Sequence, residues 1–98
     1  MGSKQDRNLV LTTVCLRTLR VTTLKRQESL ALWHLASMLP VTGEVISNAG
    51  LGQELSIDVA DITRAMKRLR ELGFLMRGPK VGVSYHYKLN PAFFRIIS

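Results

Sequence analysis

The sequence is poor in cysteine and histidine, the residues that form the disulfides of small secreted folds and bind structural zinc. Cys15 is the only cysteine, so no disulfide can form within the chain. Together with His34 and His86 it offers too few ligands for a zinc site. Disulfide-stapled and zinc-finger classes are therefore excluded, no metal or other cofactor is expected, and a reducing, cytoplasmic location is compatible with the chain.

Long hydrophobic runs are also missing. The longest, residues 30–39, is interrupted by His34 and Ser37 and stops at Pro40. It is far shorter than the roughly 20 apolar residues that a membrane span needs, so no membrane partner is expected. The chain also lacks paired carboxylates, a glycine-rich phosphate loop and a Ser-His-Asp set, and we do not expect an enzyme.

Acidic residues are scarce toward both ends of the chain, where basic residues gather. The 98 residues carry 14 Lys and Arg against 7 Asp and Glu, for a net charge of +7. Residues 1–26 hold six bases and one acid, residues 27–61 five acids and no base, and residues 62–98 eight bases and one acid. This segregation favours an anionic partner such as a phosphate backbone. A merely solvated cationic face is the alternative.

The length and the 46% apolar content fit one domain with one core. We interpret residues 1–8 as a disordered tail, because Met1-Gly2-Ser3 resembles a cloning remnant. Residues 9–98 are then expected to form the domain, starting with an N-terminal arm.

The first half of the domain contains one strong helix signal. Residues 9–24 fit a short strand or arm followed by a helical turn. Residues 25–39 are rich in helix formers and almost free of polar residues in their second half, which predicts a central helix that is apolar nearly all round and ends at Pro40. A very short strand is expected at residues 45–46.

Two capped helices are expected next. Ser47 is placed to cap a helix over residues 48–55. Asp58 is placed to cap a helix over residues 59–72, and with Asp61 it resembles a capping box.

The hydrophobic period changes to two after Gly73, which supplies the left-handed residue that closes a helix. Residues 74–77 and 83–89 then read as two strands, and residues 78–82 as a basic, glycine-rich turn between them. A last helical turn is expected from Pro91 onward.

This order of helix, short strand, helix, turn, helix and hairpin is that of a winged helix-turn-helix, an α+β, mainly helical fold with a C-terminal two-stranded wing. In such folds the second helix of the pair enters the major groove of double-stranded DNA. Ile62, Met66 and Leu69 recur at i, i+4 and i+7 and should face the core, which leaves a cationic face outward. The candidate DNA-binding residues are the helix cap, the outward residues and two bases beside the wing tip: Ser47, Ala60, Thr63, Arg64, Lys67, Arg68, Arg77 and Lys80.

Each group of candidates has its own expected role. Arg64 suits a base edge or a phosphate, Thr63 a hydrogen bond to either, and Ala60 an apolar contact with a thymine methyl group. Arg77 and Lys80 flank a tip that could approach a backbone or the minor groove.

Several short motifs stand out in the second half of the chain. They are Ser47 at the start of the first helix of the pair, Thr63-Arg64-Ala65 in the second helix, Gly73-Phe74-Leu75 after it, and the Asn-Pro-aromatic tail at residues 90–94. Together they resemble the motifs of a known family, the replication and maintenance proteins of small bacterial plasmids. The resemblance covers about the last two thirds of the chain. It implies a sequence-specific DNA-binding protein that controls replication or transcription of a plasmid or related mobile element.

Surplus apolar residues on the helix at 25–39, on the N-terminal arm and in the C-terminal Phe-Phe-Arg-Ile-Ile favour a homodimer that matches two-fold half-sites. Three alternatives remain. The basic face could serve a protein-interaction adaptor with an acidic partner, the chain could be a strand-opening replication initiator, or its aromatic residues could stack on single-stranded nucleic acid.

Overall fold

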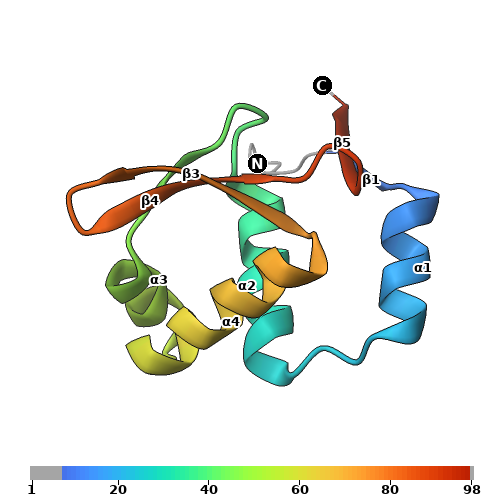
Figure 1. The fold of residues 1–98 in the computed structure, drawn as a ribbon. Helices are drawn as coiled ribbons and strands as arrows, with labels where there is room; N and C mark the ends of the chain where they lie inside the picture. The colour runs from blue at the N-terminus through green and yellow to red at the C-terminus, as the bar shows by residue number, and fades with distance from the viewer. Residues whose placement is uncertain (1–7, 98) are drawn as a thin grey trace, which may run out of the picture.

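The computed structural model describes residues 8–97 and shows an α+β fold built from helices and two small antiparallel sheets (Figure 1). The elements in chain order are β1 (Asn8–Leu11), α1 (Thr13–Val21), α2 (Arg26–Met38), β2 (Glu44–Ile46), α3 (Asn48–Leu55), α4 (Val59–Leu72), β3 (Leu75–Val81), β4 (Ser84–Leu89) and β5 (Phe94–Ile97). Most of the tail expected over residues 1–8 lies outside the described residues, and its last residue, Asn8, begins β1.

The core forms around α2, as its nearly continuous apolar surface predicted. Leu32 and Leu35 are completely buried, and they belong to one cluster with Ile62 and Leu69 of α4 and with Phe74. α2 and α4 pack against each other, and α3 packs against α4. The segment from α2 to β4 thus has the predicted winged helix-turn-helix order.

The helix boundaries follow local chemistry. α3 begins where predicted, because the Ser47 hydroxyl accepts a hydrogen bond from the Gly50 amide at 3.1 Å. Gly52 is required by close packing, since a Cβ at this position would lie 2.6 Å from the carbonyl oxygen of Ile57. α4 ends at Gly73 with φ +96°, the left-handed cap that the sequence indicated.

The wing is longer, and its turn tighter, than predicted. β2, β4 and β3 form one antiparallel sheet in that order, and β3 and β4 project from it (Figure 1). The chain reverses at Gly82-Val83, so the turn predicted over residues 78–82 is wrong. Gly78 and Pro79 instead form an irregularity within β3, between Arg77 and Lys80, because Pro79 has no amide to donate to the ladder.

The C-terminus forms a strand, so the helical turn predicted beyond Pro91 is wrong. β5 pairs antiparallel with β1, and Leu11 lies opposite Phe94. The free edge of β1 supplies a partner for the extended aromatic and β-branched residues of β5, which local propensity alone could not reveal. This ribbon lies at the end of the molecule opposite the wing tip (Figure 1).

The Asn-Pro motif closes the wing onto the end of α4. The Asn90 side-chain amide donates to the Gly73 carbonyl at 2.8 Å, and its oxygen accepts from the Ala92 amide at 2.9 Å. The Asn90 backbone amide donates to the Phe74 carbonyl at 3.0 Å. The motif therefore fixes the direction in which the wing leaves α4.

Candidate nucleic-acid interface

The outer surface of α4 is the first component of the candidate interface. Its orientation is as predicted from the helical period. The residues buried toward the core are Ile62, Ala65, Met66 and Leu69, and the exposed ones include Ala60, Thr63, Arg64 and Lys67. The exposed face carries two cations and two small side chains, which leaves room for a ligand to approach the helix closely.

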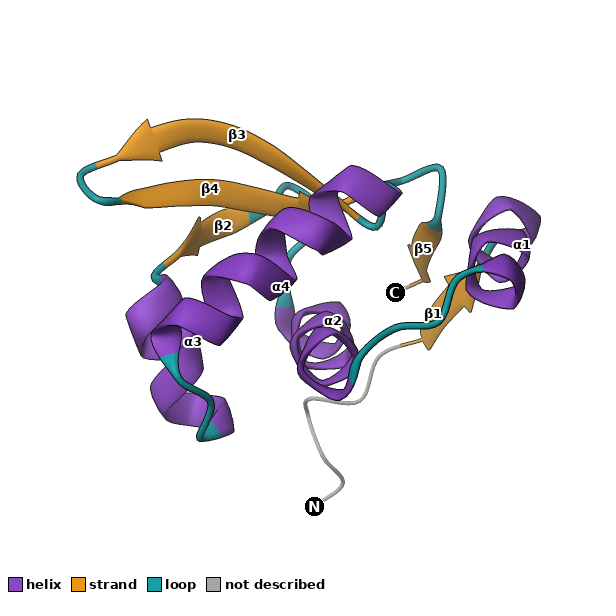
Figure 2. Ribbon diagram, turned by 60° about the horizontal axis from the view of Figure 1, so that its bottom comes forward, coloured by secondary structure: helices purple, strands orange, loops and turns teal. Residues whose placement is uncertain are grey.

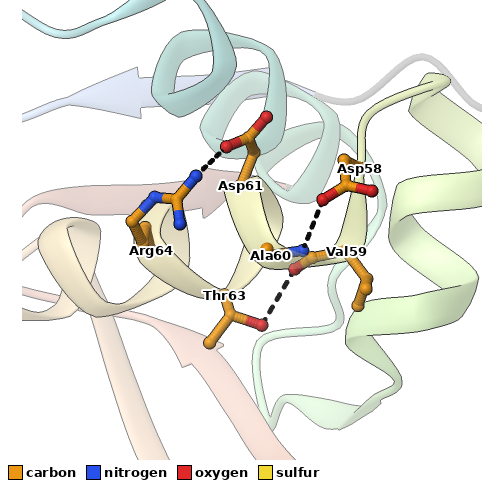
Figure 3. Close-up of polar contacts among 6 residues, drawn as sticks. All are labelled: Asp58, Val59, Ala60, Asp61, Thr63 and Arg64. Atoms are coloured by element: carbon orange, nitrogen blue, oxygen red, sulfur yellow. Dashed lines mark hydrogen bonds and ion pairs between the residues drawn. The ribbon is translucent and has the colours of Figure 1, made fainter.

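The first turn of α4 is held by a cap that differs from the predicted capping box (Figure 3). Asp58 accepts from the Ala60 amide at 3.2 Å, whereas Asp61 forms an ion pair with Arg64. Asp61 is one methylene shorter than the glutamate of a capping box, so it pairs forward along the helix. Arg64 is therefore held at the side of α4 that faces away from Thr63 (Figure 3).

Thr63 faces α3 and links the two helices of the motif. Its hydroxyl donates to the Val59 carbonyl at 2.9 Å and accepts from the Asn48 side-chain amide at 3.3 Å. Ser47, the cap of α3, is exposed next to Asn48. The start of α3 and the first half of α4 thus form one continuous polar surface.

One groove is lined by residues of α3, of α4 and of the wing, and Figure 2 shows how these three elements are arranged. Its lining includes three basic residues, Lys67, Arg70 and Arg77, together with Asn48, Thr63, Tyr85 and others. No acidic residue lines this groove. The groove is therefore a concentrated cationic surface beside α4.

The wing bases are organised by an aromatic ring. The Arg77 guanidinium carbon lies 4.2 Å from the centroid of the Tyr85 ring, and the Lys80 ammonium lies 5.9 Å from it. Both cations stack over Tyr85, and Lys80 lies opposite it in the strand register. The longer hairpin places Arg77 and Lys80 along the wing, and Gly82-Val83 forms the tip.

Arg68 does not belong to this groove. Its Nε donates to Glu28 Oε1 at 3.1 Å, and its terminal nitrogen donates to the Thr23 carbonyl at 3.5 Å. The Glu28 side chain is only 6% exposed, and its Oε1 also accepts from the Lys25 amide at 2.8 Å. Arg68 therefore ties α4 to the start of α2.

Sequence reasoning missed several residues of the groove, among them Asn48, Arg70 and Tyr85. Arg70 could have been found, because Thr63, Lys67 and Arg70 repeat at i, i+4 and i+7 along one stripe of α4. The role of Tyr85 depends on strand register and could not be found from spacing alone.

Other kinds of site find little support among residues 8–97. They contain no group of three or more His, Cys, Asp and Glu residues that could hold a metal ion. No helix in this part of the chain has the length and apolar content to cross a bilayer. Burial raises the pKa of the Cys15 thiol, which makes it a poor nucleophile.

No protein-family model and no curated protein matches the chain. Among solved structures, the chain is similar to Lactococcus lactis ZitR, wild type, in complex with DNA, with 21% sequence identity and a TM-score of 0.46. The similarity covers 82% of this chain and 50% of that one, so this chain spans about half the length of that protein.

Proposed function

We propose that this protein binds double-stranded DNA sequence-specifically, with α4 in the major groove and the wing on the adjacent backbone or minor groove. The observation that carries the proposal is the acid-free groove between α4 and the wing, where Lys67, Arg70 and Arg77 converge. Phosphate oxygens are the chemistry that such a groove fits, and the free face of α4 is the element that a major groove admits.

The two surfaces divide the work of recognition. The groove bases and Lys80 would bind phosphates, which sets register and orientation. Ala60, Thr63 and Arg64 on the outer face would meet base edges. The Asp61–Arg64 pair does not prevent this, because its side chains are 36% and 72% exposed and an exposed pair contributes less than about 1 kcal/mol.

The biological role we propose is control of replication or transcription of a plasmid or related mobile element. Its support is the sequence resemblance at Ser47, Thr63-Arg64-Ala65, residues 73–75 and residues 90–94.

We also propose a homodimer. Large apolar side chains are exposed on β1, α1 and β5, at the end of the molecule away from the wing tip: Val10, Val14, Leu16, Val21 and Ile97. Two-fold pairing through this end would leave both copies of α4 and the wing free for half-sites about one helical turn apart.

The test begins with selection of binding sites from a random duplex pool. An enriched inverted repeat, bound roughly a thousandfold or more tighter than random duplex, is the expected result. Sedimentation of the free protein should show a dimer. Steep salt dependence without sequence enrichment would overturn sequence-specific reading, and binding to an acidic protein in place of DNA would identify an adaptor.

Point variants then test the interface. Arg64→Ala should weaken binding by roughly 1 to 3 kcal/mol and relax specificity, whereas Lys80→Ala should weaken all sequences alike and make the salt dependence shallower. Lys88→Ala is the control, because Lys88 lies on the face of the wing sheet turned away from the groove. Unchanged binding in both interface variants would show that the recognition face is wrongly assigned.

A further inference from the structure

A helix in a major groove lies between two phosphate backbones. The groove is about 12 Å wide, and a helix with its side chains is about 10–12 Å across, so both backbones come within reach of the flanks of the helix. The wing serves one flank of α4. The segment beside the other flank is the start of α2, and the following inference rests on the DNA-binding function proposed above.

The start of α2 lies directly beside the first turns of α4. Lys25 and Gln27 line one surface depression together with Asp61 and Arg64. Figure 2 shows the N-terminal end of α2 and the outer side of α4 on the same side of the molecule, with the wing beyond α4. A duplex against α4 would therefore also meet residues 22–27, which we call the basic turn.

The basic turn is fixed in position by a buried carboxylate. Glu28 Oε1 accepts from both the Lys25 amide and the Arg68 guanidinium, and Arg68 also reaches the Thr23 carbonyl. The turn is thus held to the recognition helix from two points. A surface that is already fixed gives up little conformational freedom when it binds.

The charge of the basic turn is available to a ligand. The two acids nearest to it already have partners, since Glu28 pairs with Arg68 and Asp61 with Arg64. Lys25 is exposed, lines the depression beside α4, and forms no ion pair within residues 8–97. Arg26 is also exposed, but the helical period places it on the side of α2 away from Glu28. One uncompensated cation, Lys25, therefore lies beside α4 on the flank opposite the wing.

We propose that Lys25 binds a phosphate of the DNA backbone on this second flank, so that the basic turn and the wing clamp the two backbones that border the major groove. The contact is a charge-assisted hydrogen bond from the ammonium to a phosphate oxygen. It contributes affinity and orientation without reading sequence. Arg68 acts as a positioning residue for this clamp.

The test compares two variants that each remove one positive charge. Lys25→Gln removes the proposed contact. Lys88→Gln is the control, because Lys88 lies on the face of the sheet turned away from the groove. Thermal unfolding of all variants checks that they fold.

If the contact releases about 0.9 counterion, Lys25→Gln should bind the selected duplex roughly 4- to 8-fold more weakly near 0.1 M salt. The slope of log K against log salt should become shallower by about 0.9, and the preferred sequence should not change. The control should stay within about twofold of the parent, the scatter expected from a long-range change of net charge.

Ethylation interference locates the contacts. Lys25→Gln should lose interference at a phosphate on one border of the groove, and Lys80→Gln at phosphates on the other. Equal losses of affinity in Lys25→Gln and Lys88→Gln, or loss of interference at the same phosphates as in Lys80→Gln, would overturn the clamp. If the parent protein binds no duplex at all, the proposed function fails. If the parent binds DNA and Lys25→Gln binds it equally well, only the clamp is refuted.

Discussion

The Glu28–Arg68 ion pair offers a direct test of how the recognition helix is held. The Glu28 side chain is 6% exposed and that of Arg68 is 42% exposed, so the two partners differ in their access to water. Removing Arg68 should therefore destabilise the fold more than removing Glu28. Arg68→Met leaves a buried carboxylate with only the Lys25 amide as a donor, whereas Glu28→Gln leaves a guanidinium that water can still reach.

The magnitude follows from this asymmetry. Breaking a buried pair commonly costs 3–5 kcal/mol, and partial access of water through Arg68 lowers our expectation for Arg68→Met to about 2–3 kcal/mol. Glu28→Gln keeps an oxygen for the Lys25 amide, so it should cost only about 1 kcal/mol. At about 4–8 °C per kcal/mol for a domain of this size, Arg68→Met should lower Tm by roughly 10–20 °C.

The assay is urea and thermal unfolding followed by far-ultraviolet circular dichroism. Arg64→Met is the matched control, because it removes the same residue type from the same helix and breaks a pair with an exposed partner, at an expected cost below about 1 kcal/mol. In the double variant Glu28→Gln/Arg68→Met the losses should be less than additive, since no buried charge remains. Equal destabilisation by Arg68→Met and Arg64→Met would refute the argument from burial.

Three further predictions concern other parts of the fold. Gly52→Ala should destabilise the fold by about 1–3 kcal/mol, because the new Cβ would be too close to the Ile57 carbonyl. Gly50→Ala, whose Cβ would lie 3.6 Å from Ser47, should stabilise α3 by up to about 1 kcal/mol. Urea unfolding midpoints measure both changes, and a shift in the same direction for the two variants would contradict the packing. Because burial raises the pKa of the Cys15 thiol, the unfolded chain should lose the thiol proton at a lower pH than the folded protein. The free energy of unfolding should therefore fall as pH rises past the ordinary value of 9.0. The same dependence of unfolding free energy on pH in Cys15→Ala would rule this out. Tyr85→Leu should weaken DNA binding, because Arg77 and Lys80 lose the ring that holds them, whereas Tyr85→Phe keeps the ring and should bind like the parent. Equal affinities of the two variants in DNA titrations would show that the ring has no such role.

The local signals in the sequence were sufficient for the helical part of the fold. The caps at Ser47 and Asp58, the stop at Gly73 and the apolar period of residues 59–72 predicted α3 and α4 with the boundaries observed. Such signals act within a few residues of the backbone that they satisfy, so spacing reveals them.

Features that depend on contacts between distant segments were not predictable in this way. β5 exists because β1 lies beside it, and the wing turn sits at Gly82-Val83 because the ladder accommodates Pro79. The same limit applies to the candidate interface. The outward direction of Arg64 followed from the helical period, whereas the commitment of Arg68 to Glu28, forty positions earlier, did not.

The pairing of β1 with β5 brings the two ends of the described chain together, and this affects the order in which its parts fold. Asn8 and Ile97 are register partners, and no other strand pairing within residues 8–97 joins positions so far apart in sequence. Closing so long a loop is entropically unfavourable, so we expect the ribbon to form last and to open first. α1 should detach with it, because the Thr12 amide and hydroxyl that precede α1 are bound to the carbonyls of Phe93 and Ala92. Such an opening would expose Phe94, which is 4% exposed and packs against Trp33 and Phe74, so the entropy gained by opening is opposed by the loss of core contacts.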